Sequence, residues 1–151
     1  MKTVAFRPAE AADVPRLAAL MPDLYSYDGH APDAAPWAAA VAELIGTPGL
    51  GSVWLIETGG ELAGYAVLTY GYTLEYFGRY AFLDELYLVP TARGQGIGSQ
   101  TIDFLVAHAR AQGLRSLHLE VDEANRDGQH FYAARGFHYR GHMHLMSRPL
   151  P

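Results

Sequence analysis

The chain has 151 residues, half of them apolar, so it is long enough to bury one sizeable core and we expect a single domain over residues 1–151. A net charge of -5 leaves no basic face for DNA or RNA, so we expect no nucleic-acid partner; a cationic small substrate suits this balance better. The absence of cysteine excludes disulfides, thiolate zinc sites and a cysteine nucleophile. No stretch is apolar enough to span a bilayer and the N-terminus carries no leader pattern, so we expect a cytoplasmic protein without a membrane partner.

The first third of the chain predicts a short strand and two helices. The strand is expected over residues 3–6 and the first helix over residues 11–20, where acidic and small residues form the cap. The second helix is expected over residues 37–45, because apolar residues recur there at helical spacing and Gly46 ends the run.

The middle of the chain changes to the period of strands. Residues 53–72 predict a hairpin that turns at two adjacent glycines, and residues 81–90 predict the next strand, which Pro90 ends. The glycine-rich stretch RGQGIG follows at residues 93–98. It leads into a helix that Gly113 is placed to cap. The apolar stripe of that helix is Ile102, Leu105, Val106 and Ala109.

The last third predicts a strand over residues 114–121, a short helix over residues 125–136 and a closing strand or hairpin over residues 137–150. The order of elements indicates an α+β domain with a strand, glycine loop, helix, strand unit at its centre. Three imidazoles on one face of the closing strand could bind zinc, but no cysteine or carboxylate completes the set nearby, so we expect no metal. These residues are His138, His142 and His144.

The glycine stretch is placed to bind an anion. Backbone N–H groups at a helix start attract negative charge, and glycines let the backbone approach a phosphate closely. A dinucleotide fingerprint would need glycine where Ser99 stands, and a Walker loop would need a lysine, whereas the only lysine is Lys2. No G-x-S-x-G elbow is present either, which argues against a hydrolase.

The sequence LYLVPTARGQGIGSQTIDFLVAHA resembles the hallmark of the GNAT N-acetyltransferases, R/Q-x-x-G-x-G/A, when it is read from Arg93. FRPAEAADVPRL is similar to the first strand and helix of that family, and LHLEVDEANRDGQHFYAARGFHYR to its fifth strand and following helix. The resemblance covers most of the chain and is nearest to the spermidine/spermine type. It implies a mixed, mostly antiparallel sheet that is splayed between its fourth and fifth strands, with helices on both faces and acetyl-CoA in the gap.

The resemblance also implies which residues bind acetyl-CoA. The pyrophosphate would lie on the amides of the glycine loop, and the pantetheine would pair like an extra strand along the fourth strand. A backbone N–H near Leu86 would meet the developing oxyanion if the strand bulges. The candidate cofactor-binding residues are Leu86, Leu88, Val89, Arg93, Gly94, Gln95, Gly96, Ile97, Gly98, Ser99 and Asn125.

The transfer of acetyl to an amine requires a base. The amine must attack in its neutral form, and with a pKa of about 10.4 its deprotonation at pH 7 costs on the order of 4–5 kcal/mol. Asp84 and Glu85 are the only carboxylates in the strand that would flank the thioester, and adjacent strand residues point to opposite faces. Similar enzymes that act on polyamines have Glu-Asp here, whereas this chain has Asp-Glu. The base therefore stays open between the two residues.

The departing thiolate requires an acid. A tyrosine hydroxyl with a pKa of about 10 can protonate a thiolate whose conjugate acid has a pKa of about 8.5. The resemblance assigns this role to Tyr132, although the ring could also serve only as packing beside Phe131 and Phe137.

Two tyrosine-rich segments combine ring faces with carboxylates, a mixture that suits an ammonium group, although tyrosine is also simply a good strand residue. We therefore expect an N-acetyltransferase that acetylates the primary amine of a small molecule by direct attack. The alternatives are a protein or peptide N-terminal acetyltransferase and a non-catalytic acetyl-CoA-binding regulatory module. Family resemblance also implies a homodimer. The candidate substrate-binding residues are Tyr25, Tyr27, Asp28, Tyr72, Glu75 and Tyr76.

Overall fold

The computed structural model describes the backbone of residues 3–27 and 34–151 and the side chains of residues 3–24 and 34–151. The chain divides into two compact units, Met1–Glu120 and Val121–Pro151. The expectation of one domain over residues 1–151 stays a prediction. Within the described ranges, no helix is both long and apolar enough to cross a membrane.

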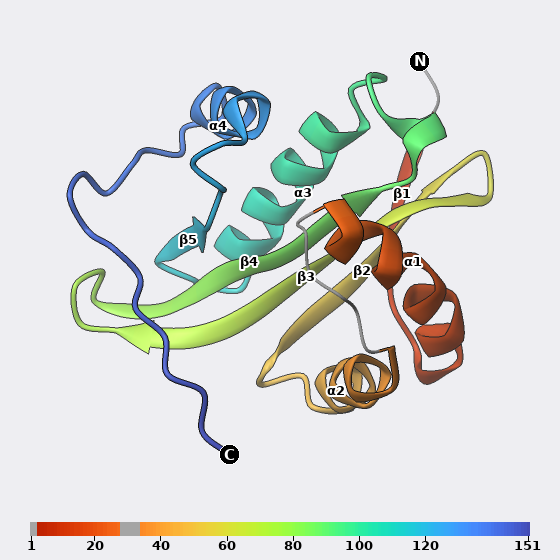
Figure 1. The fold of residues 1–151 in the computed structure, drawn as a ribbon, viewed down its shortest axis with the longest axis horizontal. Helices are drawn as coiled ribbons and strands as arrows, with labels where there is room; N and C mark the ends of the chain where they lie inside the picture. The colour runs from red at the N-terminus through yellow and green to blue at the C-terminus, as the bar shows by residue number, and fades with distance from the viewer. Residues whose placement is uncertain (1–2, 28–33) are drawn as a thin grey trace. The chain divides into compact units, whose positions relative to one another are not determined.

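The first unit contains a sheet and three α-helices (Figure 1). Its strands are β1 (Val4–Pro8), β2 (Gly51–Thr58), β3 (Glu61–Thr73), β4 (Gly78–Leu88) and β5 (Ser116–Leu119). Its α-helices are α1 (Val14–Tyr27), α2 (Ala34–Gly46) and α3 (Ile97–Ala111), and the short 3₁₀ helices are η1 (Ala11–Asp13) and η2 (Pro90–Ala92).

The five strands form one sheet in the order β1-β2-β3-β4-β5. The first four are antiparallel neighbours, whereas β4 and β5 are parallel. The β5 pairing reaches only from Tyr80 to Leu83 of β4, although β4 continues to Leu88. The predicted mixed, mostly antiparallel sheet that opens between its fourth and fifth strands is confirmed.

A β-bulge interrupts β4 at the place where β5 pairing ends. Leu68 of β3 pairs with Leu83, and the preceding Val67 pairs with Glu85, so Asp84 is the extra residue. A bulge bends its strand and shifts which side chains face each side of the sheet. It places Glu85 on the same face as Val67, and this face is the one that α1 and α2 cover.

The two faces of the sheet have separate apolar cores. On one face, α1 and α2 bury Leu17 and Val41 against Leu55 and Tyr65 of the sheet. On the other face, α3 stacks Phe104 on Phe6, with ring centroids 4.3 Å apart. Figure 1 shows α1 and α2 together over β2 and β3, while α3 runs beside β4. Helices on both faces were predicted and are confirmed.

Helix α1 is longer than the sequence predicts. It was expected to end near Leu20, but it continues through Pro22 to Tyr27. Proline removes one helical hydrogen bond and normally ends a helix. Here the buried Met21, 2% exposed, lies directly before Pro22 and holds this turn against the core.

The second unit contains α4 (Arg126–Ala133), which Asn125 caps by accepting a hydrogen bond from the N–H of Gly128 at 2.9 Å. The helix ends at Ala133, three residues before Gly136, where the sequence predicts its end, and a turn leads to Gly136 with φ of 83°. The predicted closing strand over residues 137–150 is wrong, because these residues are described without strand structure. Alternating apolar residues suit a strand, but they do not supply the neighbouring backbone that a strand must pair with.

Candidate active site

The free edge of β4 lies next to the bulge. The N–H of Val89 donates to the carbonyl of Ala63 at 2.9 Å. Because an antiparallel ladder alternates its hydrogen bonds, Glu85 and Tyr87 also direct their backbone groups to β3, and Leu86 and Leu88 direct theirs to the opposite edge. Since β5 pairing stops at Leu83, this edge has the polar groups that an added extended chain would need.

The glycine loop joins this strand to α3. Gly94 and Gly96 have φ of 71° and 76°, a conformation that L side chains rarely adopt. No atom lies within 4 Å of a Cβ built on either residue, so the backbone conformation, and not crowding, requires glycine here. Gly96 is the N-cap of α3, and the first bond of the helix runs from the N–H of Gln100 to the carbonyl of Gly96 at 3.1 Å. The N–H groups of the first turn precede that bond and are those that bind anions.

Two side chains of the loop brace it instead of projecting from it. The Nε of Arg93 donates to the carbonyl of Leu88 at 2.9 Å, and its guanidinium lies 5.5 Å from the centre of the Tyr87 ring. The Nε2 of Gln95 donates to the carbonyl of Thr91 at 2.6 Å. Both residues were predicted to bind the cofactor. Their side chains hold the loop in shape, and the N–H of Arg93 also donates within it, to the carbonyl of Pro90 at 3.3 Å.

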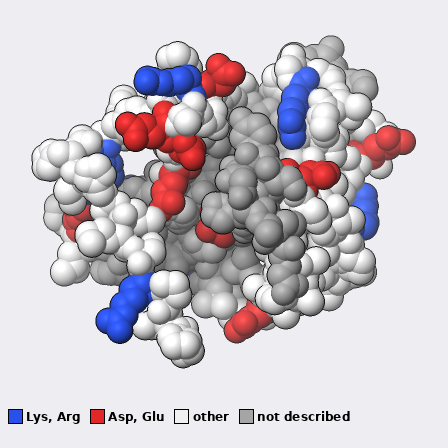
Figure 2. All heavy atoms as spheres, viewed as in Figure 1, with Lys and Arg blue, Asp and Glu red and all other residues white. Residues whose placement is uncertain are grey.

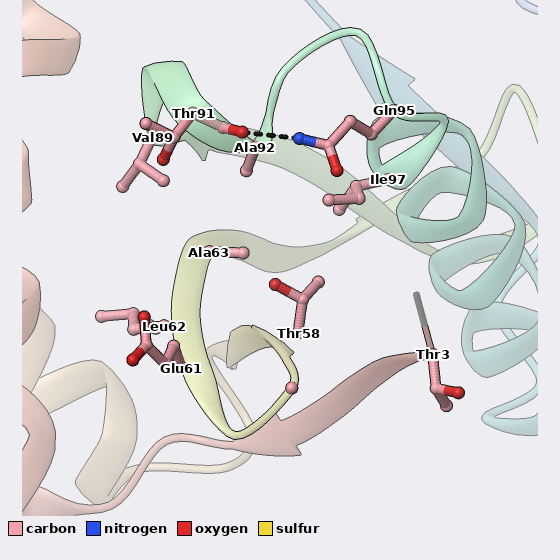
Figure 3. A pocket seen from close by; sticks show the side chains of 11 residues that line it. Thr3, Thr58, Glu61, Leu62, Ala63, Val89, Thr91, Ala92, Gln95 and Ile97 are labelled. Carbon is pink, nitrogen blue, oxygen red and sulfur yellow. Dashed lines mark hydrogen bonds between the residues drawn. The ribbon is translucent and has the colours of Figure 1, made fainter. Parts of the chain in front are cut away.

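A crevice of about 480 Å³ borders the same loop (Figure 3). Its walls come from the turn between β2 and β3 and from residues 89–97, and the side chains of Ala63, Ala92 and Ile97 line it with apolar surface. The Gln95 side chain turns toward Thr91 along one wall (Figure 3). This crevice lies beside β3, whereas the open edge of β4 faces away from β3.

Glu85 is a buried carboxylate with two donors. It is 9% exposed. The indole Nε1 of Trp37 donates to Oε2 at 3.1 Å, and the hydroxyl of Tyr65 donates to Oε1 at 3.4 Å. Hydrogen bonds from two donors stabilise the charged carboxylate. Glu85 is therefore a buried carboxyl that two donors hold in place beneath α2.

Asp84 has a different environment, although it is the adjacent residue. Its side chain keeps exposed surface at the bulge. The surrounding protein nevertheless removes part of the water around the carboxyl, and this burial raises its pKa. Loss of water around the carboxyl is the cause of this shift. The two neighbouring carboxyls thus have unlike surroundings, since Glu85 is held by two buried donors whereas Asp84 keeps exposed surface and has a raised pKa.

Tyr87 connects the end of α1 to the glycine loop. Its hydroxyl donates to Oδ2 of Asp23 at 3.3 Å, and burial together with Asp23 raises the pKa of this hydroxyl. The ring also contacts Arg93, as described above. Tyr87 of β4 thus contacts both α1 and the glycine loop before α3.

Tyr132 lies on α4 in the second unit. Its ring makes edge contacts with Phe131 and Phe137, with centroids 5.1 and 5.8 Å apart. Burial raises the pKa of the Tyr132 hydroxyl, so it carries its proton at neutral pH. Asn125, the other predicted site residue of this unit, uses its carboxamide oxygen to cap α4.

The predicted substrate residues whose side chains are described, Tyr72, Glu75 and Tyr76, have unlike surroundings. Tyr72 is 69% exposed at the tip of the β3–β4 hairpin, and Glu75 is exposed in the turn. Tyr76 instead packs its ring against His118 at 5.0 Å. The side chains of Tyr25 and Tyr27, and all of Asp28, lie outside the described residues.

Sequence reasoning did not find four residues that lie around the acceptor side of β4. Their positions depend on which strand faces meet, and no local motif marks them. A tryptophan that opens a helix and tyrosines in strands are typical of packing in any sheet protein. These residues are Trp37, Tyr65, Tyr80 and His118.

His138, His142 and His144 are exposed and belong to a segment without strand structure, so the expected shared strand face is not formed. In the part of the chain that is described, no group of three or more His, Cys, Asp or Glu side chains is arranged to hold a metal ion. The face drawn in Figure 2 shows its basic side chains singly, with neutral or acidic neighbours.

A sheet that opens beside β5, a bulge at that opening and a glycine loop that starts a helix define a class of proteins that bind an extended, anion-bearing cosubstrate along one strand edge. The Acetyltransferase (GNAT) family matches residues 16–137, and the chain belongs to this family. It is 32% identical over 96 residues to thialysine N-epsilon-acetyltransferase of Bos taurus, a match that covers 64% of this chain and 52% of that protein. The chain thus spans about half the length of the curated relatives it matches.

Solved structures show the same fold. An integron cassette protein from the mobile metagenome of Cole Harbour Salt Marsh is 34% identical, with a TM-score of 0.85 over 97% of this chain and 91% of that one. A predicted acetyltransferase from Clostridium acetobutylicum, solved with acetyl-CoA, has a TM-score of 0.79 at 18% identity and covers 96% of each chain. At that identity the second likeness establishes the fold alone.

Proposed function

We propose that this protein is an acetyl-CoA-dependent N-acetyltransferase that transfers acetyl to the primary amine of a small molecule by direct attack. The observation that carries the proposal is the glycine loop at the start of α3, directly after the β4 edge that β5 leaves open. Membership of the GNAT family supports the reaction. The thialysine N-epsilon-acetyltransferases among its relatives support a small amine as the acceptor.

The residues present fit acetyl-CoA, which supplies an activated acetyl thioester when bound. The amides of residues 93–99 would hold its pyrophosphate, because Gly94 and Gly96 present backbone without side chains in the way. The backbone of Leu86 and Leu88 would pair with its extended arm, although the carbonyl of Leu88 already accepts from Arg93. The N–H of Leu86 is the donor we assign to the developing oxyanion.

The two adjacent carboxylates have different roles toward the amine. Asp84 serves as the base, because its raised pKa brings it nearer the neutral range in which a base is efficient. Glu85 serves as the anchor for the incoming ammonium, because Trp37 and Tyr65 hold its carboxyl in a fixed position. After Asp84 has accepted the proton, the neutral amine attacks the carbonyl carbon.

Tyr132 gives its proton to the departing thiolate. Burial raises the pKa of its hydroxyl, which keeps the proton in place until a strong acceptor forms. The contacts with Phe131 and Phe137 fix the direction of the ring on α4.

The test is thiol release from acetyl-CoA against a panel of polyamines, aminoglycosides, amino acids and peptide amines. The protein has no cysteine and so contributes no thiol of its own. We expect turnover with one class of small amine, and a loss of about 10²-fold or more in kcat for Tyr132→Phe. Tyr139→Phe is the matched control, since Tyr139 is a 70% exposed tyrosine of the same unit.

Other outcomes would favour other functions. If a peptide amine outcompetes every small amine, the protein is an N-terminal acetyltransferase instead. If acetyl-CoA binds tightly by calorimetry but no amine is consumed, and Tyr132→Phe changes nothing, the chain is a cosubstrate-binding regulatory module.

A further inference from the structure

Tyr87 is a buried side chain of β4 that contacts groups of opposite charge. It is 4% exposed, and its hydroxyl donates to Oδ2 of Asp23 at 3.3 Å. The guanidinium of Arg93 lies 5.5 Å from the centre of its ring. Burial and Asp23 raise the pKa of the Tyr87 hydroxyl and Arg93 lowers it, so both charged groups act on this one side chain. Tyr87 therefore connects a carboxylate of α1 to a guanidinium of the glycine loop.

The Tyr87 ring has a fixed position in the core. It belongs to the same apolar cluster as Leu17 and Tyr65, and the centroids of the two tyrosine rings lie 6.0 Å apart. Tyr65 is fully buried and donates to Glu85, so it is itself held in place. Because protein interiors are close-packed, a ring held by core contacts and by Asp23 at its hydroxyl has little freedom to move. Tyr87 is therefore a rigid support for the guanidinium that lies against it.

Arg93 turns the first residue of the glycine loop back toward β4. Its Nε donates to the carbonyl of Leu88 at 2.9 Å, and its backbone N–H donates to the carbonyl of Pro90 at 3.3 Å. Gly94 follows with φ of 71°, and glycine leaves the backbone freer than any other residue does. The direction of the next amides therefore depends on how firmly Arg93 is held. The face of the Tyr87 ring attracts its guanidinium and supplies part of that restraint.

We infer that Tyr87 is a positioning residue for acetyl-CoA, which acts through Arg93 to hold the glycine loop in the shape that binds the pyrophosphate. This inference rests on the proposed function. Arg93 then contributes to the affinity for acetyl-CoA by bracing the loop against Tyr87 and Leu88, and not by a direct ion pair with the phosphates. Tyr87 itself takes no part in the transfer of the acetyl group.

The experiment compares acetyl-CoA with S-acetylpantetheine, which keeps the thioester and the extended arm but lacks the pyrophosphate. Calorimetry gives the Kd for acetyl-CoA, and thiol release with the best amine of the panel gives kcat and KM for both thioesters. For Tyr87→Leu and Arg93→Met we expect the Kd and KM for acetyl-CoA to rise about threefold to tenfold, because the loop loses its restraint. The ratio of kcat/KM for acetyl-CoA to that for S-acetylpantetheine should fall by the same factor, through KM and not through kcat.

Three further variants separate this role from a general loss of structure. Because both side chains act through one contact, the double variant Tyr87→Leu/Arg93→Met should lose no more acetyl-CoA affinity than either single variant. Tyr87→Phe keeps the ring and should keep the Kd. Tyr70→Leu is the matched control, because Arg79 lies 5.3 Å from the centre of the Tyr70 ring, in the half of β3 next to the β3–β4 hairpin. It should lower the free energy of unfolding and leave the Kd for acetyl-CoA unchanged.

Arg93 is exposed, so Arg93→Met tests the inference without a change in the core. Equal losses with acetyl-CoA and S-acetylpantetheine would overturn the positioning role, since a general change of structure has that effect. Additive losses in the double variant would also overturn it, because Arg93 would then act on the phosphates independently of Tyr87. If no amine is turned over but the Kd for acetyl-CoA responds as expected, the proposed transferase fails and the positioning role stands.

Discussion

At the scale of single residues, the site depends on two neighbouring carboxylates with unlike surroundings. Asp84 is the extra residue of a bulge and has a pKa raised by burial. Glu85 is buried between Trp37 and Tyr65, which both donate to it. Adjacent titratable groups that differ in this way can take different roles in one reaction.

Asp84→Asn and Glu85→Gln should therefore have different kinetic effects. We expect Asp84→Asn to lower kcat by about 10²- to 10⁴-fold, because the general base is lost. In the wild type, kcat/KM should rise with pH as Asp84 deprotonates, at a pH above the ordinary range of aspartate because its pKa is raised. Glu85→Gln should keep this rise of kcat/KM with pH and should raise the KM for the amine. If Glu85→Gln loses the rise of kcat/KM with pH and Asp84→Asn keeps it, these roles of the two carboxylates are refuted.

At the scale of elements, the proposed anion site depends on the backbone geometry of β4, the glycine loop and α3. Gly96 combines φ of 76° with the N-cap position, so it determines both the shape of the loop and the start of the helix. Gly113, at the other end of the same helix, has φ of 71° and equally open surroundings. The two glycines share a backbone conformation but only one lies at the anion-binding end.

Gly96→Ala should weaken acetyl-CoA binding by about tenfold, since an L residue at positive φ costs about 1–2 kcal/mol and shifts the loop. Gly96→Asp should abolish binding, because its carboxylate would meet the pyrophosphate. Gly113→Ala is the matched control, and it should lower the free energy of unfolding by a similar amount but leave the Kd for acetyl-CoA unchanged. Calorimetry that finds the same Kd for wild type and Gly96→Asp would contradict the loop assignment.

At the scale of the whole molecule, two titratable groups connect helices to the sheet, the buried Asp13 and the half-buried His108. Asp13 of η1 receives two hydrogen bonds from Arg7 of β1, both at 2.9 Å, and this partner lowers the pKa of Asp13 to about 2. His108 of α3 packs against Trp54 and Phe104, with centroids 4.9 and 6.2 Å apart, and burial lowers the pKa of its imidazole. Both groups make the folded state bind protons less readily than the unfolded state.

The free energy of unfolding should fall in two steps as the solution is acidified. The His108 contribution is complete above the ordinary histidine pKa of about 6.5 and is lost below it. The Asp13 contribution is complete above about 4 and is lost as the pH falls toward the folded value of about 2. Urea titrations over this pH range should lose the first step in His108→Gln and the second in Asp13→Asn. His138→Gln, which changes an exposed histidine, should keep both.

The glycine loop, the helix after it and the strand before it were predictable because their signals are local. Positive φ at Gly94 and Gly96, an apolar stripe on α3 and the end of β4 near Pro90 each depend on residues a few positions apart. The same locality explains the turn at Gly59 and Gly60. The family resemblance predicted the opening of the sheet between β4 and β5.

Other features depended on contacts between residues distant in sequence. Pro22 is a local stop signal that burial of its neighbour Met21 overrides, and the alternating residues 137–150 form no strand. Trp37 reaches Glu85 across 48 positions, and the bulge that aligns Glu85 with Val67 is a property of pairing between two strands. The sequence by itself determined that the chain has a glycine loop at the start of a helix and beside an extended strand, because backbone preference is local. Only the tertiary structure decided which carboxylate is buried and which rings share its face, because these depend on register and on which helix covers the sheet.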